Sequence, residues 1–436
     1  MTYSYPFIGR WAAIWAHRNM LPHGGKEVIL KAMYALLWSV ALPLGVPYLL
    51  LSGRGLRERL GIWGKGLPAA PLWAHAASMG EVRAASAVVA WLLNFKPGVR
   101  VLFTTTSSTG RDLARRRWGC AYLAPLDHPL LVRRVLRNVR PRAVLLTEGE
   151  LWPGTIREAR RTGIPVALIN GRISERTFRW YSRFGSIMRR VIGSLDLLCV
   201  QSQRDGERFL RLGARPERTF VVGNVKGGEP EGEPLKRDAL RSSFGIHPER
   251  PVLVAGSTRE GEEAVLLEGL EKLWARWPDL LVVLAPRHLE RLGEVERLLK
   301  EHGVRYVLRS RMEGNLPQVL LVDTMGELTK FYAMADLAFV GGSFVPLGGH
   351  NPFEPASLGL PVTFGPHMRQ EGWERLCEDG AAVMVHDAVE WAKVASRLLE
   401  DPDLRLKMGR KGQEHAARLR EAARRTAELL ISYGIV

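Results

Sequence analysis

Residues 72–81 read LWAHAASMGE, a short apolar run followed by a turn of small and polar residues. The run Leu72–Ala76 is typical of a buried strand, and the amphipathic stretch after the turn predicts a helix over Glu81–Leu93. Gly80 permits a tight turn, and Glu81 falls in the first turn of that helix. A strand followed directly by a helix is the repeating unit of a helix-covered parallel sheet, so this stretch indicates an α/β fold.

The same alternation continues on both sides of a break at residues 226–250, which are rich in Gly, Pro and charge and are typical of a linker. We therefore predict two Rossmann-like doubly wound domains that face each other across a cleft. The predicted strands are Leu72–Ala76, Val101–Thr105, Ala143–Leu146, Val166–Ile169, Leu195–Val200 and Thr219–Val222, then Val252–Ala255, Leu280–Ala285, Val304–Leu308, Val319–Val322, Leu337–Val340, Pro361–Phe364 and Ala382–Val385. The predicted organisation is an extension and anchor at 1–53, one domain at 54–225 and a second at 226–436.

The composition agrees with this organisation. A chain of 436 residues exceeds the size at which single cores stop growing, and 46% hydrophobic with 25% charged residues exclude a disordered or fibrous protein. Its three cysteines, Cys120, Cys199 and Cys377, are odd in number and far apart, so they predict neither a disulfide framework nor a zinc site. A reducing compartment is expected.

The net charge of +17 is unevenly distributed: residues 54–225 carry +18, whereas residues 226–436 carry −4. A field of this kind favours an anionic partner such as a membrane surface, an acidic lipid or a nucleic acid. An Arg-rich solvated face is the simpler alternative. Nucleic-acid readers interleave aromatic residues with their basic residues, and the tryptophans here gather near the amino-terminal apolar run and at helix starts instead, which disfavours nucleic acid.

One segment predicts an interaction with a membrane. Between Lys31 and Arg54 lie 22 residues without a formal charge, and a helix of that length reaches about 33 Å. Pro43 and Pro47 would kink such a helix, and Trp38 is a typical interfacial anchor, so a tilted or monotopic helix fits as well as a spanning one. A buried helix of the first domain is the alternative.

Polar residues gather in the turns that follow strands, where ligands of open parallel sheets bind. In the first domain these are Glu81 and the pair Glu148 and Glu150 before Trp152. A helix N-terminus lowers the pKa of a carboxyl group, so Glu81 could serve as a base only if desolvation compensates. The two other acids would project in the same direction from an extended backbone and could share a proton, or they are a solvated pair at a helix start.

The second domain offers groups for an anion. Ser257 lies in the turn GSTREGE, whose backbone amides suit phosphate, and the turn after the next strand adds Arg287 and His288. The segment 341–355, GGSFVPLGGHNPFEP, brings backbone close to a ligand at its glycine pairs, and Glu354 could accept hydrogen bonds from paired sugar hydroxyls. No Walker lysine loop, GxGxxG fingerprint or HExxH spacing is present, so we predict no metal and no cofactor.

The strand-to-helix turns and their flanks contain a series of motifs: HAASMGEVRA, TEGELWPG, NGRISERTFRWY, QSQRDGERFLRLG, GNVK, GSTREGEE, APRHLER, DTMGELTKFYAMAD and GGSFVPLGGHNPFEPASLGLPVTFGPH. Taken together, these motifs resemble the 3-deoxy-D-manno-octulosonic acid (Kdo) transferases of lipopolysaccharide biosynthesis. The resemblance runs in order from about residue 54 to past His367, and the segment before it is similar to the membrane anchor of that family.

The resemblance implies a GT-B glycosyltransferase that moves Kdo from CMP-Kdo to a lipid A precursor, lipid IVA, in an inverting displacement. Glu81 would be the general base, with Glu148 and Glu150 as further catalytic candidates. Ser78, Gly80, Arg172 and Arg176 would bind the acceptor. The donor would be bound by Ser257, Arg287, His288, Gly326, Glu327, Gly349, His350, Asn351 and Glu354. The protein would lie at the cytoplasmic face of the inner membrane, on an anionic surface.

Two departures from the family pattern stand out. The family commonly has E-T-E-x-W-P-N where this chain has Gly149 and Gly154, and commonly G-N-x-K-F-D where this chain has Gly227 and Gly228. Another GT-B glycosyltransferase, or a sugar-nucleotide epimerase with a different donor, is the alternative function. The sequence leaves open the number of Kdo residues added, the exact acceptor, the oligomeric state and the role of residues 1–30.

Overall fold

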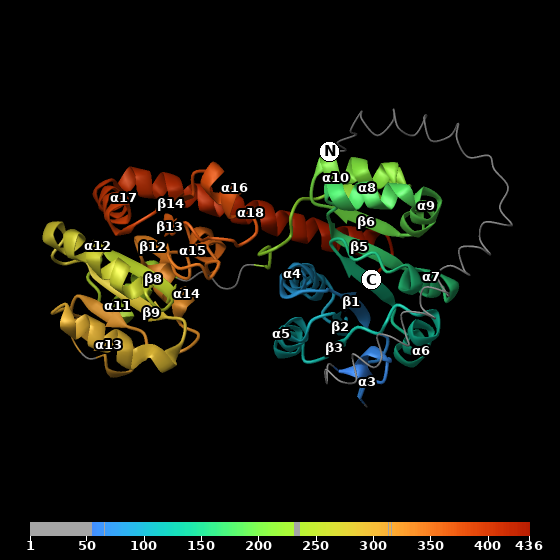
Figure 1. Cartoon of the computed structure of the whole chain (residues 1–436), viewed down its shortest axis with the longest axis horizontal. Helices are drawn as coiled ribbons and strands as arrows, with labels where there is room; N and C mark the ends of the chain where they lie inside the picture. Colours follow the sequence, from blue (N-terminus) through green and yellow to red (C-terminus); the bar gives the residue numbers. More distant parts are fainter. Residues whose placement is uncertain (1–54, 65, 231–235, 313, 315) are drawn as a thin grey trace. The chain divides into compact units, whose positions relative to one another are not determined.

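The structure is a computed structural model that describes residues 55–64, 66–230, 236–312, 314 and 316–436 (Figure 1). The apolar run after Lys31, and with it the predicted anchor, lies outside these residues. Within the described part of the chain, no helix combines the length and the apolar character that crossing a bilayer requires. The chain divides into two compact units, one comprising Met1–Pro230 with Leu419–Val436 and the other Glu231–Arg418.

The first unit is built on a seven-stranded parallel sheet with the order β3-β2-β1-β4-β5-β6-β7. Its strands are β1 (Leu72–His75), β2 (Val101–Thr105), β3 (Ala121–Leu123), β4 (Ala143–Thr147), β5 (Val166–Gly171), β6 (Leu197–Val200) and β7 (Thr219–Val221). Its helices are α3 (Leu56–Arg59), α4 (Met79–Phe95), α5 (Ser108–Trp118), α6 (Pro129–Val139), α7 (Pro153–Arg161), α8 (Glu175–Arg183), α9 (Gly185–Gly193) and α10 (Gln203–Arg211), with a 3-10 turn at Pro216–Arg218.

The order of strands reverses at β1, where Leu72 is aligned with Val101 of β2 on one side and with Ala143 of β4 on the other. Helices α4 and α5 cover one face of the sheet, and α6 and α7 cover the other (Figure 1). Because both faces are buried, the strands are continuous apolar runs instead of alternating patterns. The carboxyl ends of β1 and β4 form the switch point at which such sheets bind ligands.

The second unit repeats this plan with a parallel sheet of order β10-β11-β9-β8-β12-β13-β14. Its strands are β8 (Val252–Thr258), β9 (Leu281–Pro286), β10 (Tyr306–Leu308), β11 (Val319–Leu321), β12 (Leu337–Val340), β13 (Val362–Phe364) and β14 (Ala382–Met384). Its helices are α11 (Arg237–Ser243), α12 (Glu262–Arg276), α13 (Leu292–Glu301), α14 (Leu328–Met334), α15 (Phe353–Ser357), α16 (Trp373–Glu378) and α17 (Ala388–Glu400), with 3-10 turns at Leu289–Arg291 and Arg309–Arg311. The predicted α/β class with two doubly wound sheets is therefore confirmed.

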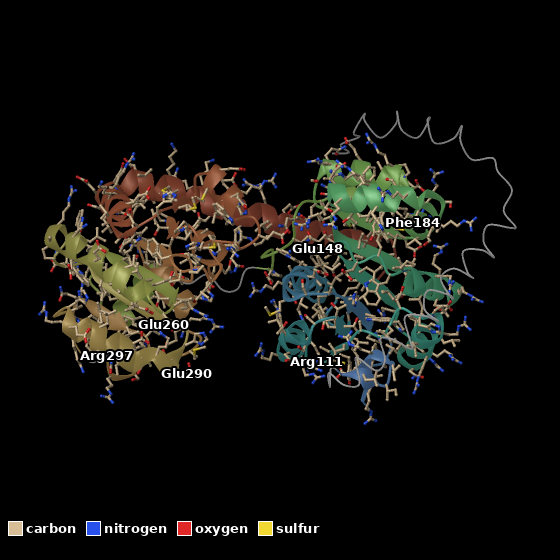
Figure 2. All side chains as sticks on the ribbon, viewed as in Figure 1. Arg111, Glu148, Phe184, Glu260, Glu290 and Arg297 are labelled. Atoms are coloured by element: carbon tan, nitrogen blue, oxygen red, sulfur yellow. The ribbon has the colours of Figure 1, made fainter. Side chains whose placement is uncertain are left out.

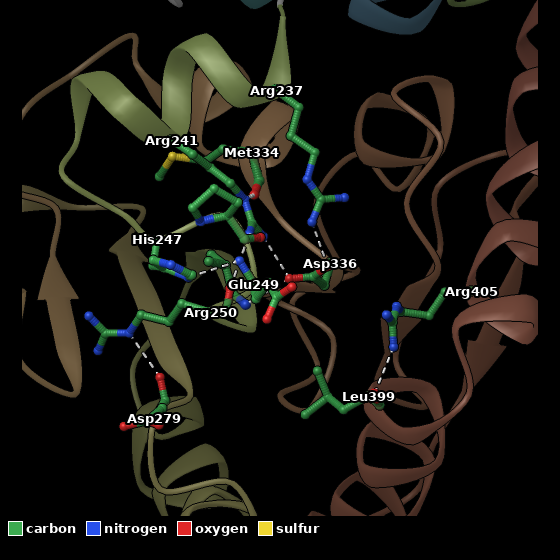
Figure 3. A network of polar contacts seen from close by, with 12 residues as sticks. Arg237, Arg241, His247, Glu249, Arg250, Asp279, Met334, Asp336, Leu399 and Arg405 are labelled. Atoms are coloured by element: carbon green, nitrogen blue, oxygen red, sulfur yellow. Dashed lines mark hydrogen bonds and ion pairs between the residues drawn. The ribbon is translucent and has the colours of Figure 1, made fainter.

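A polar network joins the amino edge of the second sheet to α11 (Figure 3). Asp336, which precedes β12, accepts hydrogen bonds from Val252 N at 2.9 Å and from Arg241 Nη2 at 2.8 Å, and it pairs with Arg237. The buried Arg241 also donates to the carbonyls of Met334 and Arg250. The buried cation therefore has an ionic partner and several carbonyls, which is the condition for keeping a charge in a core.

The long helix α18 (Pro402–Ser432) begins in the second unit, and its residues from Leu419 onward belong to the first. Ala422, Ala427 and Leu430 are buried in the same core as β1 and α4. The sequence prediction assigned all of 226–436 to the second domain. It missed this return because the pairing of α18 with the first core is a contact between residues more than three hundred positions apart.

The predicted linker at 226–250 is also shorter in the structure. Residues up to Pro230 belong to the first unit, whereas Leu240 of α11 and Phe244, which caps that helix, pack in the core of the second unit. The short edge strand β3 has no counterpart among the predicted strands, since three residues carry too little pattern to recognise.

Candidate active site

The candidate site of the first unit lies at the carboxyl ends of β1, β4 and β5, and its central residue is Glu81. Ser78 caps helix α4: its Oγ accepts from Glu81 N at 3.3 Å and donates to Glu81 Oε1 at 3.1 Å. Glu81 Oε2 accepts from Ala77 N at 2.8 Å. This reciprocal arrangement is close to a capping box, and it fixes the carboxylate at the start of α4.

The pKa of Glu81 is raised to about 7. Burial is the main cause, and the negative charges of Glu150 and Glu148 add to it, against the lowering effect of the hydrogen bonds from Ala77 and Ser78. The structure thus meets the condition set by the sequence, namely that desolvation must compensate for the helix N-terminus. A carboxyl group with a pKa near 7 is suited to accept a proton at physiological pH.

Glu148, labelled in Figure 2, follows β4. It forms an ion pair with Lys226, whose Nζ lies 2.7 Å from Glu148 Oε1. Asn170 Nδ2 donates to the same oxygen at 3.3 Å. Glu148 and Asn170 both have positive φ, 58° and 51°, at the ends of neighbouring strands. Such conformations are uncommon for non-glycine residues and gather at functional sites, where surrounding contacts hold them.

Glu150 has a different set of partners. Its Oε2 accepts from Trp152 Nε1 at 2.7 Å and lies 3.8 Å from Nε2 of the buried His75. Burial opposes ionisation of Glu150, but His75 and Trp152 outweigh it and hold the pKa of Glu150 below its ordinary value. The His75 ring meets Trp152 edge-on with centroids 4.6 Å apart.

The extended backbone from which Glu148 and Glu150 were expected to project in the same direction is absent. Glu148 is in the left-handed conformation instead of an extended one, and each of the two acids is held by its own cationic or ring N–H partner. The group that remains difficult to ionise is Glu81. The three acids therefore act as one electrostatic cluster in which the charges of two raise the pKa of the third.

The residues predicted to bind an acceptor lie at the start of α4, directly after β5 and in α8. Ser78 is exposed. A Cβ atom built on Gly80 would lie 3.7 Å from Lys226 Nζ, which shows that the Lys226 ammonium lies close to the start of α4. Arg172 follows β5, and Arg176 lies in α8; both are exposed. Arg176 lines a surface hollow of about 830 Å³ together with Glu175, Thr177, Arg179, Trp180, Tyr181 and Arg183.

Helix α8 borders the carboxylate cluster as well as this hollow. The pKa of Tyr181 is raised by burial and, in addition, by the charge of Glu150. Trp180 remains 54% exposed, which is unusual for the largest apolar side chain, and it is surrounded by arginines. The structure therefore places a basic and aromatic surface next to Glu150.

The two departures in the sequence motifs have structural reasons. A Cβ at Gly154 would lie 2.3 Å from the carbonyl oxygen of Asp127, whose carboxylate accepts from Gly154 N and Thr155 N at 2.7 Å and so caps α7. A Cβ at Gly228 would lie 2.2 Å from the carbonyl oxygen of Leu419. Both glycines permit close approaches of backbone within the first unit.

In the second unit the predicted donor residues lie at the carboxyl ends of β8, β9, β11 and β12. Ser257 has a positive φ of 58°, and a Cβ at Gly341 would lie 2.5 Å from the carbonyl of Ser257, so the two turns touch. The backbone of Arg287 donates to Thr258 O at 3.0 Å. The Arg287 side chain is exposed and forms no ion pair with any described residue, and His288 is exposed nearby. The exposed Arg287 guanidinium is therefore suited to bind an anionic ligand.

Gly326 and Glu327 form the turn before α14. Glu327 Oε1 accepts from Arg309 Nη2 at 3.1 Å, and its Oε2 accepts from Thr324. The hydrogen bond from Thr324 is the main cause of the lowered pKa of Glu327, and Arg309 adds to it. Both oxygens of Glu327 thus hold the turn in place.

The glycine-rich segment after β12 folds back on itself. Gly349 N donates to Gly342 O at 2.6 Å, and His350 N donates to Gly341 O at 2.9 Å. Asn351 is exposed, and its Oδ1 accepts from Phe353 N at 3.1 Å at the start of α15. Glu354 accepts from Thr329 of α14, so α15 is tied to the helix that follows Glu327.

The sequence reading missed several members of these two groups. Lys226, His75 and Asn170 belong to the motifs GNVK, HAASMGEVRA and NGRISERTFRWY, but they are not among the site residues predicted from the sequence. Their positions at the end of a strand, or at the end of the first domain, are the sequence features that could have identified them. Among the described residues, no cluster of three His, Cys, Asp or Glu side chains suits a metal ion.

Comparison with known proteins identifies the family. A family model described as 3-deoxy-D-manno-octulosonic-acid transferase (kdotransferase) matches residues 54–228. The 3-deoxy-D-manno-octulosonic acid transferase of Haemophilus influenzae is 35% identical over 392 residues, covering 87% of this chain and 91% of that protein. The enzyme of the same name from Bordetella pertussis is 36% identical over 380 residues, covering 83% and 87%.

Among solved structures, UDP-GlcNAc 2-epimerase from Neisseria meningitidis has a TM-score of 0.54 at 14% identity, covering 83% of this chain and all of that one. At this identity the likeness shows a shared two-domain fold of the GT-B type and nothing about the reaction. The relatives with more than 30% identity, in contrast, show to which family the chain belongs. The chain belongs to the 3-deoxy-D-manno-octulosonic acid (Kdo) transferases and is a glycosyltransferase.

Proposed function

We propose that this Kdo transferase takes Kdo from CMP-Kdo and adds it to a lipid A precursor, lipid IVA, by an inverting displacement. The observation that carries the proposal is the carboxyl group of Glu81, held by Ala77 and Ser78 with a pKa raised to about 7 at the switch point of the first sheet. A group of that kind is what the reaction needs, because an alcohol must lose its proton as it attacks.

In the proposed step, Glu81 accepts the proton of the acceptor hydroxyl while the hydroxyl oxygen forms a bond to the anomeric carbon of Kdo. The bond from that carbon to the phosphate oxygen breaks, and CMP leaves with the electron pair. Configuration at the anomeric carbon inverts because attack and departure occur on opposite faces. Loss of such a base typically costs about 10²- to 10⁴-fold in rate.

Glu148 and Glu150 act on Glu81 through their charges. Lys226 pairs with Glu148, and Trp152 with His75 contacts Glu150. In addition to burial, the negative charges of the two acids make proton uptake by Glu81 more favourable. This is a positioning and electrostatic role, in which the pair raises the basicity of a third group without receiving the proton itself.

The donor is assigned to the second unit. Arg287 is exposed at the end of β9 and is a suitable partner for the phosphate of CMP, because a guanidinium can form charge-assisted hydrogen bonds to two phosphate oxygens. Glu354 and the turn at Gly326 are candidates for the ribose and the base, with Ser257, His288, Gly349, His350 and Asn351 around them.

The acceptor is assigned to the first unit, whose residues 54–225 carry a net charge of +18. Lipid A precursors bear phosphates and acyl chains, and the hollow at α8 offers both kinds of contact: Arg176, Arg179 and Arg183 for phosphate, Trp180 for an apolar chain. Ser78 and Gly80 lie beside Glu81 at the start of α4, and Arg172 directly follows β5; they are the proposed contacts nearest the reacting hydroxyl.

A direct assay tests the proposal. Purified protein is incubated with CMP-Kdo and a tetraacylated lipid A precursor, and the product is identified by mass, which also counts the Kdo residues added. Release of CMP together with a product heavier by one or more Kdo units is the expected result. No product with this pair, in the presence of measurable CMP binding, would contradict the assignment of the acceptor.

We also propose that the protein works at the cytoplasmic face of the inner membrane and that residues 1–53 attach it there. The support is the uncharged run between Lys31 and Arg54 together with the basic first unit. A chain that begins at Arg54 should leave the membrane fraction at high salt, since screening limits the reach of the remaining basic surface to about 8 Å at physiological ionic strength. If it stays bound in 1 M salt (~3 Å screening), the run is not the main anchor.

A further inference from the structure

The structure contains a second glutamate in the same topological place as Glu81. Glu262 lies in the first turn of α12, after β8, just as Glu81 lies in the first turn of α4, after β1. Both strands are the ones at which the order of their sheet reverses. Glu262 is fully buried, whereas Glu81 is only half-buried.

Four backbone N–H groups donate to the carboxylate of Glu262. Its Oε1 accepts from Ser343 N and Phe344 N, each at 2.8 Å, and its Oε2 accepts from Arg259 N at 2.9 Å and from Gly342 N. A carboxylate has about four acceptor positions and no donor, so this set of partners uses all of its capacity and fits only the ionised form. Burial raises the pKa of Glu262, and the four hydrogen bonds oppose that effect.

Three of these amides belong to the glycine-rich segment in which the sequence suggested a site for an anion. Successive N–H groups that point to one place form an anion-binding nest. Here the nest at Gly342, Ser343 and Phe344 is filled by the protein's own carboxylate. An external phosphate therefore has no access to these amides, and the exposed Arg287 is left as its partner.

Glu262 also connects the turns that carry the donor residues. Through Arg259 N it holds the turn after β8, where Thr258 O accepts the backbone N–H of Arg287. Through Gly342 and its neighbours it holds the first leg of the segment after β12. The second leg, which carries Gly349 and His350, is bonded to that first leg at Gly342 O and Gly341 O.

We propose that Glu262 is a positioning residue for the donor: its carboxylate fills an amide nest and thereby fixes the turns that present Arg287, Gly349 and His350 to the nucleotide. The inference rests on the proposed function, because it assumes that these turns bind CMP-Kdo. Replacement of Glu262 by Gln keeps the size of the side chain but puts an NH₂ group against backbone N–H donors. At least one leg of the nest must then separate.

A matched control exists in the same unit. Asp336 is a largely buried carboxylate with a backbone N–H and two arginine partners (Figure 3). It precedes β12 at the amino edge of the sheet, whereas the donor turns follow the carboxyl ends of the strands. Asp336→Asn should therefore disturb the unit without reaching the donor residues. A merely structural role of Glu262 predicts similar behaviour of both variants, whereas a positioning role separates them.

The experiment first measures the melting temperatures of wild type, Glu262→Gln and Asp336→Asn. The affinity of each protein for CMP is then measured by calorimetry at a temperature well below its melting point. We expect Glu262→Gln to weaken CMP by at least about tenfold, as for the loss of one or more hydrogen bonds to a charged group, and Asp336→Asn to stay within about twofold. Steady-state kinetics of Glu262→Gln should show an increased KM for CMP-Kdo with the KM for the acceptor unchanged. Equal CMP affinities for wild type and Glu262→Gln, or equal losses in both variants, would overturn the inference.

A measurement on the wild type covers the case in which Glu262→Gln does not fold. Hydrogen exchange of the amides of Gly342, Ser343 and Phe344 should be slow before CMP is added, because Glu262 already holds them. Amides that exchange rapidly and become protected only with CMP would show that the nucleotide occupies the nest, which contradicts the proposal. If the wild type binds no CMP at all, the assignment of the donor fails, and slow exchange would still show that Glu262 fills the nest.

Discussion

Glu81 and Glu262 occupy the same place in two copies of one fold, yet their surroundings differ. Glu262 is fully buried and accepts four backbone N–H groups. Glu81 accepts one backbone N–H and one hydroxyl, and burial together with the charges of two further carboxylates raises its pKa to about 7. The difference teaches that the number of committed acceptor positions, rather than the position in the fold, decides whether a carboxylate can take a proton from a substrate or serves only to hold loops.

The largest expected effect comes from removing the carboxylate of Glu81, whose acceptor positions are only partly used by hydrogen bonds. Glu81→Gln should lower the rate of Kdo transfer by about 10²- to 10⁴-fold, because the acceptor hydroxyl loses its proton acceptor. CMP affinity should stay the same, since Glu81 is in the acceptor unit. Turnover within tenfold of wild type, measured by release of CMP at saturating substrates, would remove Glu81 from the role of base.

Replacement of Arg287, the exposed cation after β9, should have the next largest effect. Arg287→Ala should weaken CMP binding by about 10- to 100-fold, as expected for the loss of a charge-assisted hydrogen bond. The KM for the lipid acceptor should change little. Equal weakening of both substrates, in separate titrations, would contradict the assignment of donor and acceptor to different units.

The comparison also predicts stability changes of opposite sign. The pKa of Glu81 is higher in the folded protein than its ordinary value of 4.5, so the folded state binds more protons than the unfolded state between those values, and stability falls as pH rises from 4.5 to about 7. Glu81→Gln removes this penalty and should raise the melting temperature at pH 8 by a few degrees, with no gain near pH 4.

Glu262→Gln should lower the melting temperature at pH 8, because it leaves backbone N–H groups unsatisfied in a buried place. Thermal melts of both variants beside the wild type, at pH 4 and pH 8, check the pair of signs. A Glu81→Gln protein that is less stable than wild type at pH 8 would show that its capping contacts outweigh the cost of the buried charge.

Much of this contrast could not be read from the sequence. The strand and helix patterns predicted both sheets, and Glu81 stood out because it follows a strand and a glycine. The motif GSTREGEE indicated amides that suit an anion, but no pattern tells which acceptor fills them, and here it is Glu262. The left-handed backbone of Glu148 and the ion pair with Lys226 arise from contacts between distant residues, as does the return of α18 to the first core.

The central claim is that Glu81 is a base whose pKa is raised by burial and further by its carboxylate neighbours. The pH dependence of kcat/KM in wild type and in Glu148→Gln tests this claim most directly. Wild-type activity should rise with pH through a single limb near pH 7, because Glu81 must be deprotonated to act. Loss of the negative charge of Glu148 should move that limb to lower pH, because this charge is one of the causes that raise the pKa of Glu81. Ionisation of a substrate phosphate would place the limb at the same pH in both proteins. A limb that does not move, or a flat profile between pH 6 and 8, would contradict the account.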